Sequence, residues 1–452
     1  MTTRKFRAPR TTGAWAPALA LAALLAGCAS TAVVENAPAE STPPPRSYSL
    51  ATSNPDRQAN DILLNLAFSG GGTRAAALSY GVLKALRDTE LTIGGRTRRL
   101  LDEVDAITSV SGGSFTAAYY GLYGDRTFTD FEKVFLRRDV EQALISRVVS
   151  PASVLDSAGR TESAIKDYDE NVFHGATYAD LARANGPLIV INASDLGHGV
   201  RFSFLQEYFN LLCSDLSTFP VARAVAASSA VPVLFSPVVV RNYPDCGATP
   251  PPWLVELRRR TAGDERATQL VDGLSSYFDK DKRKYIHFVD GGVTDNLGLR
   301  ATFDIIETTG GPAAFLQKLS RRPPREIAFI VVNAATEPEM AMDGSDQPPS
   351  LIETIQAIND IQVHRYSSDT IELMKQSLAE WAKTLSAPER PVTAYFIQLS
   401  FRDLAPERRK SFNQIPTRFV LSNEQVDRLI AVGGELLRAN PEFQRLLADI
   451  AR

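Results

Sequence analysis

The chain has 452 residues, of which 44% are apolar and 22% charged, and its formal net charge at pH 7 is −3. These proportions are those of a globular protein with room for two to three domains, and they exclude a disordered or collagen-like chain. The slightly acidic balance argues against nucleic acid as a partner.

The first 27 residues have the parts of a bacterial signal peptide. Four basic residues and no acidic residue lie among the first ten, and an apolar run from Trp15 to Leu25 follows. This run is too short to span a bilayer as a mature helix. It ends in Leu25-Ala26-Gly27-Cys28, which resembles a lipobox, so we predict that cleavage before Cys28 leaves this thiol carrying lipid. A plain secretory signal with an incidental cysteine is the alternative.

A lipid on Cys28 predicts a protein anchored in the bacterial cell envelope, at the outer membrane and facing the periplasm. Loss of residues 1–27 leaves 45 Lys and Arg against 52 Asp and Glu, so the lipid, not a basic surface, would hold the protein at the membrane. Residues 28–60 are rich in Ala, Ser, Thr and Pro, which predicts a flexible tether. The folded domain is expected over residues 61–452.

The domain is predicted to begin with a strand, Ile62–Phe68, whose nearly continuous apolar sequence is typical of a strand covered on both faces. Ser69-Gly70-Gly71-Gly72-Thr73-Arg74 follows and opens an apolar helical stripe, an arrangement that presents N–H groups to an anion. A dinucleotide site needs an acid at the end of a second strand about 20 residues further on, where we expect a loop over 90–95. A phosphate-binding P-loop needs Gly-Lys-Ser/Thr, which is absent. An oxyanion hole remains, and it predicts a nucleophile on the next strand.

The segment Thr108-Ser109-Val110-Ser111-Gly112-Gly113-Ser114 supplies that nucleophile. It lies between a short apolar run, 104–107, and a predicted helix, 115–123. A serine between a strand and a helix, with glycine directly after it, is the pattern of a nucleophile elbow. Ser109 stands where the first glycine of that pattern is usual.

An acidic residue follows a later strand in the same way. Tyr285–Val289 is predicted to be a strand that runs into Asp290-Gly291-Gly292, and the carboxyl ends of strands form the rim where open α/β sheets keep their sites. The preceding segment, 241–284, has three prolines and mixed charge, and we expect either a lid over the site or a plain surface excursion.

Further strands are predicted at 187–193, 201–204, 327–332 and 391–401. Strands that alternate with helices in this way predict an α/β fold with a mostly parallel central sheet and helices on both faces.

Together these motifs resemble the patatin-like phospholipase family. The matching segments are the glycine loop at 70–74, the nucleophile motif at 109–113, the small-residue block before a proline at 227–232, the Asp-Gly-Gly motif at 290–292 and the Asn-Leu-Gly at 296–298. They come in the family's order within core residues 62–300, and a strand and helices at 327–452 complete the domain. Ser69, Ala75 and Ser109 depart from the family's usual residues.

The resemblance implies a three-layer serine acyl hydrolase of the phospholipase A or lysophospholipase type, acting on a phospholipid or other lipid ester without a cofactor. It implies Ser111 as nucleophile and Asp290 as general base, and shielding from water would raise the pKa of Asp290 toward the working pH. The oxyanion hole is expected to be formed by Gly70, Gly71, Gly72, Thr73 and Arg74, with Arg74 either fixing a substrate phosphate or bracing the loop. The supporting motif residues are Ser109, Gly112, Gly113, Gly291 and Gly292.

Two alternatives stay open. A Ser-His-Asp triad would use His198, which lies in a predicted turn. A lipoprotein that binds lipid without catalysis could also have a hydrolase-like fold. No cluster of His, Cys and acidic residues has metal-binding spacing, so no metal is expected. Cys213 and Cys246 could form a disulfide in an oxidising periplasm or remain two buried thiols.

Overall fold

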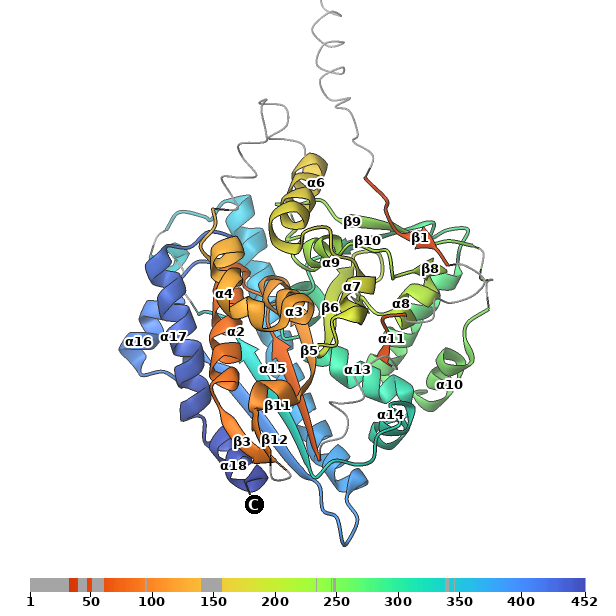
Figure 1. The fold of residues 1–452 in the computed structure, drawn as a ribbon. Coiled ribbons are helices and arrows are strands. Elements are labelled where there is room, and N and C mark those ends of the chain that lie inside the picture. Colours follow the sequence, from red (N-terminus) through yellow and green to blue (C-terminus); the bar gives the residue numbers. More distant parts are fainter. Residues whose placement is uncertain are drawn as a thin grey trace, which may run out of the picture.

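The computed structural model describes residues 32–39, 47–50, 61–93, 96–139, 157–232, 234–244, 246, 249–337, 341–344 and 346–451. Within these residues, an eight-stranded sheet crosses the middle of the molecule and helices lie on both sides of it (Figure 1). The predicted signal peptide and Cys28 lie outside the described residues.

The strands are β1 Ala37–Pro38, β2 Ile62–Phe68, β3 Glu90–Ile93, β4 Arg96–Arg99, β5 Val104–Val110, β6 Leu188–Asp195, β7 Val200–Ser203, β8 Ser214–Asp215, β9 Val238–Arg241, β10 Tyr285–Val289, β11 Glu326–Asn333 and β12 Thr393–Ser400. Five of them, in the order β12-β11-β2-β5-β6, run parallel to one another. Strand β10 pairs antiparallel with β6 and with β9, and β7 pairs antiparallel with β6. The predicted mostly parallel sheet is therefore confirmed, with an antiparallel part at one side.

The helices are α2 Gly72–Arg87, α3 Gly112–Tyr123, α4 Thr127–Phe131, α6 Ser157–Tyr168, α7 Tyr178–Arg183, α8 Gln206–Leu211, α9 Val221–Ser228, α10 Pro252–Arg260, α11 Glu265–Ser275, α12 Gly292–Asp295, α13 Leu299–Thr309, α14 Pro312–Lys318, α15 Leu351–Leu385, α16 Pro406–Asn413, α17 Asn423–Ala439 and α18 Pro441–Ile450. None of the helices searched in the described part of the chain combines the length and the apolar character that crossing a bilayer requires.

Strand β2 is apolar at nearly every position because both of its faces are covered. Ile62, Leu64 and Leu66 belong to a core shared with α2, α3 and α17, whereas Leu63 and Ala67 belong to a second core shared with α13, α14 and α15. Successive side chains of a strand point to opposite faces, so a strand between two helical layers needs apolar residues at every position. The predicted three-layer arrangement is confirmed.

Part of the segment expected to be a tether packs on the domain instead. The Asn36 side chain donates to Ser214 Oγ and to the carbonyl of Arg241, each at 2.9 Å, and β1 pairs with β8. Tyr48 and Leu50 are buried, and the hydroxyl of Tyr48 accepts the N–H of Ile189 at 2.6 Å. The tether prediction is therefore wrong for residues 32–39 and 47–50, because a few apolar and amide side chains anchor these pieces.

A second expectation also fails near the start of the domain. Residues 90–93, expected to be part of a loop, form strand β3, which pairs with β4. Leu91 is partly buried and packs against the core, so the alternation of apolar and polar side chains in this short segment was a strand signal.

Two features of the periphery bear on function. Cys213 and Cys246 form a disulfide, with Cα atoms 5.4 Å apart.

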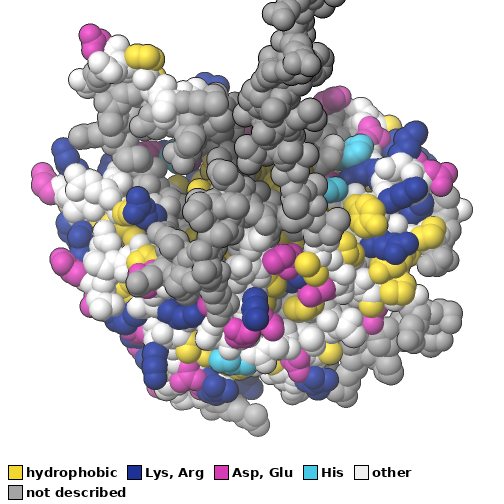
Figure 2. All heavy atoms as spheres, turned by 90° about the horizontal axis from the view of Figure 1, so that it is seen from above, with side chains coloured by type: hydrophobic (Ala, Val, Ile, Leu, Met, Phe, Trp, Pro, Cys, Tyr) yellow, Lys and Arg dark blue, Asp and Glu magenta, His cyan; other side chains and the backbone are white. Residues whose placement is uncertain are grey.

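Seen from above, the acidic and basic side chains drawn for the described residues are intermixed, without one continuous basic patch (Figure 2). This face thus resembles an ordinary solvated surface.

Candidate active site

The strand register brings the carboxyl ends of β5 and β10 together. Strand β5 pairs with β6 as far as Val110, opposite Asn192, and β10 pairs with β6 from Val289, opposite Ser194. Because β7 pairs with β6 at both of these β6 residues, β5 and β10 must share the other edge of β6. The two strands run in opposite directions and end head to head, so the residues that follow them become neighbours.

Ser111 follows β5 and precedes α3 in a strained conformation. Its φ of 50° and ψ of −123° lie where few residues other than glycine are found. A Cβ on Gly112 would lie 1.9 Å from the carbonyl oxygen of Gly72, so only glycine fits beside this serine. Gly113 packs in the same way against the Phe68 carbonyl, and Ser109 is fully buried in β5. The geometry is that of the predicted nucleophile elbow.

A second serine holds the elbow in place. Ser228, at the end of α9, accepts the N–H of Ser111 at 2.8 Å and donates to the carbonyl of Asn192 at 2.6 Å. Its hydroxyl also lies 3.1 Å from the hydroxyl of Ser114. No role was predicted for Ser228, although it lies in the small-residue block at 227–232. Nothing in that block distinguished Ser228 from the neighbouring Ser229.

Asp290 is buried beside Ser111. Only 8% of its surface is exposed, and its carboxylate accepts the N–H of Gly292 at 2.7 Å. Burial raises the pKa of Asp290 from 3.8 to about 6, although hydrogen bonds from Gly292 and from the Ser111 side chain lower it. A Cβ on Gly291 would lie 2.4 Å from the carbonyl oxygen of Asn192, so the chain turns away from the sheet at a glycine. The structure therefore brings the two predicted residues into contact.

The glycine loop offers fewer N–H donors than expected. The N–H of Gly70 donates to the carbonyl of Asn296, and that of Thr73 donates to the carbonyl of Arg418, each at 2.9 Å. The prediction that Gly70 and Thr73 contribute donors is therefore wrong. Within the described residues, the N–H groups of Gly71 and Gly72 have no recorded acceptor.

Arg74 braces the loop from behind. The residue is 3% exposed, and its guanidinium donates to the carbonyls of Ala334 at 2.9 Å and Ile415 at 2.7 Å, and to Thr417 Oγ1 at 2.8 Å. These bonds use all three nitrogens of the guanidinium, so of the two expected roles of this side chain the structure supports bracing the loop.

The N-termini of two helices meet at this site. Helix α2 begins at Gly72 and α3 at Gly112, and the backbones of these two residues are in direct contact. Each helix N-terminus carries partial positive charge and unpaired N–H groups. A hydroxyl beside a buried carboxyl, with such N–H groups next to it, can attack a carbonyl and hold the oxyanion that results.

The other candidates lie elsewhere. His198 is exposed in the turn between β6 and β7, whereas Ser111 is 5% exposed. Among the residues that could be searched, no group of His, Cys, Asp and Glu could hold a metal ion. Segment 241–284 forms α10 and α11, which pack against α13 and β7.

Comparison with known proteins gives one family match. A family model described as patatin-like phospholipase matches residues 66–303, a range that contains Ser111 and Asp290. No curated protein matches the chain in sequence.

Several solved structures are similar in part. Human GIVD cytosolic phospholipase A2 is 13% identical over 87% of this chain and 62% of that chain, with a TM-score of 0.40. VipD from Legionella pneumophila is 13% identical over 95% of this chain and 73% of that chain, with a TM-score of 0.31. The present chain thus spans less than two thirds of the human protein.

Proposed function

The chain belongs to the patatin-like phospholipase family, and we propose that it is a serine acyl hydrolase that cleaves ester bonds of phospholipids or related lipids with Ser111 and Asp290. The observation that carries this proposal is the contact between a strained, buried serine and a buried carboxyl. Family membership supports the lipid substrate.

The first half of the proposed reaction forms an acyl-enzyme. Asp290 removes the proton of Ser111 as its Oγ attacks the ester carbonyl, and a pKa of about 6 leaves the carboxyl mostly ionised at neutral pH while making it a stronger base than an exposed aspartate. The oxyanion is held by the N–H groups of Gly71 and Gly72 at the start of α2. Loss of one such donor costs about 3–4 kcal/mol of transition-state stabilisation. Asp290 then returns the proton to the departing alcohol.

The second half releases the acyl group. Asp290 takes a proton from water, the water attacks the acyl-enzyme carbonyl, and the same N–H groups hold the second oxyanion. Collapse of that intermediate returns the proton to Ser111 Oγ and frees a fatty acid. One carboxyl serves as base and acid in turn, so this scheme needs no histidine.

We also propose that the protein is a lipoprotein of the bacterial cell envelope, anchored through Cys28 at the outer membrane and facing the periplasm. Support comes from the lipobox-like sequence and from the Cys213–Cys246 disulfide, since disulfides persist in oxidising compartments such as the periplasm. Labelling of growing cells with a radioactive fatty acid should modify the wild type and not Cys28→Ala. Equal labelling of both would contradict the anchor.

The catalytic proposal is tested by labelling and hydrolysis. We expect a fluorophosphonate probe to label the wild type, and Ser111→Ala to abolish labelling and hydrolysis of phospholipids and p-nitrophenyl esters. Asp290→Asn should be folded and inactive, and His198→Ala should be close to wild type. An active Asp290→Asn enzyme would exclude the dyad, and an inactive but folded His198→Ala enzyme would favour the triad.

A further inference from the structure

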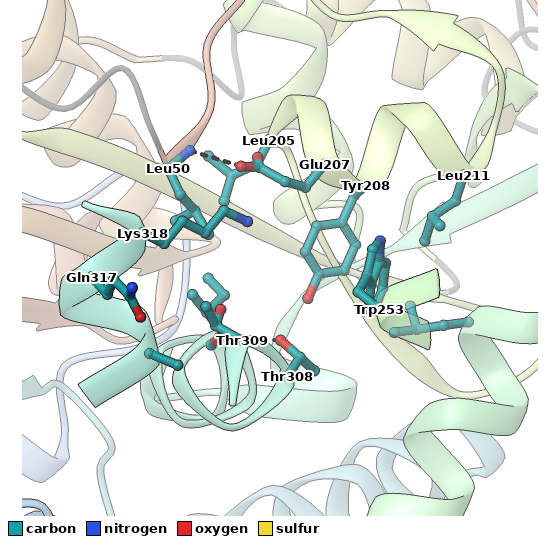
Figure 3. Close-up of a pocket in the computed structure, with 13 residues that line it drawn as sticks. Leu50, Leu205, Glu207, Tyr208, Leu211, Trp253, Thr308, Thr309, Gln317 and Lys318 are labelled. Carbon is teal, nitrogen blue, oxygen red and sulfur yellow. Dashed lines mark hydrogen bonds between the residues drawn. The ribbon is translucent and has the colours of Figure 1, made fainter. Parts of the chain in front are cut away.

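A pocket lies away from Ser111 and Asp290. Its volume is about 390 Å³, and it is bounded by α8, α10, α11, α13, α14 and Leu50 (Figure 3). Ser111, Asp290 and the glycine loop do not line it. The volume is near the lower end of the range for small-molecule sites, about 300–1,000 Å³, which suits one lipid chain better than two.

One end of this pocket is apolar. Leu211 and Trp253 lie together on one side of the view (Figure 3). Leu274 and Ile305 also line the pocket. Trp253 is 38% exposed and comes from segment 241–284, the part of the sequence expected to be a lid or a surface excursion. An exposed indole at the edge of an apolar pocket can cover a hydrocarbon chain. Covering a bound hydrocarbon chain would give segment 241–284 a role, which the proposed reaction does not.

The other end of the pocket carries the carboxylate of Glu207 and the ammonium of Lys318. Glu207 Oε1 accepts the N–H of Leu50 at 3.0 Å, while its Oε2 is buried and has no partner in the described residues. Burial raises the pKa of Glu207, and the charge of Lys318 partly offsets that rise. Figure 3 shows both side chains near Leu50, across the pocket from Leu211. This end therefore offers a buried acceptor without a donor, beside an exposed ammonium that can pair with an anion.

We propose that this pocket binds a lysophospholipid, a lipid with one acyl chain, a free glycerol hydroxyl and a phosphate. The chain lies against Leu211, Trp253 and Leu274, the phosphate pairs with Lys318, and the hydroxyl donates to Glu207 Oε2. A free fatty acid fits less well, because its carboxylate would stand beside Glu207 without supplying a donor. The site is separate from Ser111, so the proposal does not depend on the catalytic one.

Calorimetric titration of the full chain tests this pocket. The probe is an ether-linked lysophosphatidylcholine with a dodecyl chain, used below its micelle concentration, because it has no ester to hydrolyse. We expect one equivalent to bind after fluorophosphonate labelling has blocked the active site. Dodecylphosphocholine, which lacks the glycerol hydroxyl, and dodecanoate should each bind at least about tenfold more weakly, the cost of leaving a charged group without its hydrogen bond.

Two variants and one control complete the test. Leu274→Trp fills the pocket and should abolish binding, and Lys318→Met should weaken it about tenfold or more. Lys383→Met, which removes an exposed ammonium on α15, should bind like the wild type. Lys318 is exposed, so its variant will fold even where Leu274→Trp does not.

The outcomes separate the two proposals. Loss of probe binding on fluorophosphonate labelling would mean that the lipid occupies the active site, and the second site would be wrong. Equal affinity of the Lys318 and Lys383 variants, or of the lysolipid and dodecylphosphocholine, would overturn the assignment of the head group. If the fluorophosphonate fails to label Ser111, the catalytic proposal fails, while titration of the unlabelled chain still measures the pocket.

Discussion

Replacement of Asp290 by Asn should stabilise the protein while it destroys activity. The pKa of this carboxyl is about 6 in the folded chain against 3.8 for an ordinary aspartate, so the folded state binds a proton more tightly than the unfolded state. Stability from this group is complete below pH 4 and is lost as pH rises to about 6, because the unfolded chain ionises first. A difference of about two pKa units corresponds to about 3 kcal/mol at pH 8.

Urea unfolding of wild type and Asp290→Asn between pH 4 and pH 8 measures this cost. The difference between the two free energies of unfolding isolates Asp290, because Asp295 and Glu326, whose pKa values burial raises to about 6 and about 7, titrate in both proteins. We expect the variant to gain up to about 3 kcal/mol relative to wild type between pH 4 and pH 6 and to keep that gain above it. Ser111→Ala is the matched control, since it is inactive but retains the carboxyl and should retain the pH dependence.

The rate should follow the same titration. Asp290 acts as a base, so kcat/KM for a neutral ester should rise with pH, reach half its maximum near pH 6 and level off above pH 7. An Asp290→Asn variant whose stability relative to wild type does not change with pH would refute the raised pKa. A rate that falls as pH rises through 6 would refute the role of base.

Three further changes test the supports of the site. Ser228→Ala should lower the free energy of unfolding by about 1–3 kcal/mol and slow fluorophosphonate labelling, because the N–H of Ser111 loses its acceptor. Ser229→Ala is the control: it removes a hydroxyl that bonds the carbonyl of Val225 in the same helix, and it should cost less than about 1 kcal/mol. Arg74→Lys should lower the melting temperature markedly, since an ammonium cannot reproduce the three directed bonds of the guanidinium. A change in KM for phospholipids without a change in melting temperature would indicate that Arg74 contacts the substrate phosphate instead. Reduction of the Cys213–Cys246 disulfide should cost about 4 kcal/mol by the chain-entropy estimate for a separation of 33 residues, and an unchanged urea midpoint in dithiothreitol would contradict this.

Ser111, Asp290 and strand β2 could be predicted from the sequence because residues next to them in the chain mark each one. An elbow serine needs glycine after it and a strand before it, and both lie within a few residues of Ser111. Asp290 ends a strand and precedes two glycines, and strand β2 is apolar at nearly every position because it is covered on both faces. Each of these features is specified by neighbours in the chain.

The oxyanion loop shows where local information ends. Five consecutive residues, 70–74, were expected to act together, but the N–H groups of two of them are taken by carbonyls of Asn296 and Arg418. Arg74 is likewise held by residues more than 250 positions away. A glycine run shows that the backbone can approach something closely, and only the folded chain shows what it approaches.

Local sequence patterns were enough to predict the fold class and the layers, and to propose Ser111 and Asp290 as the reacting pair. Their contact depends on register: β5 and β10 share one edge of β6 and end head to head. Strand order and antiparallel pairing come from long-range hydrogen bonds and packing, which leave no periodic mark in a single strand. Long-range packing therefore places Ser111 beside Asp290, brings Ser228 to the N–H of Ser111, and forms the pocket between five helices.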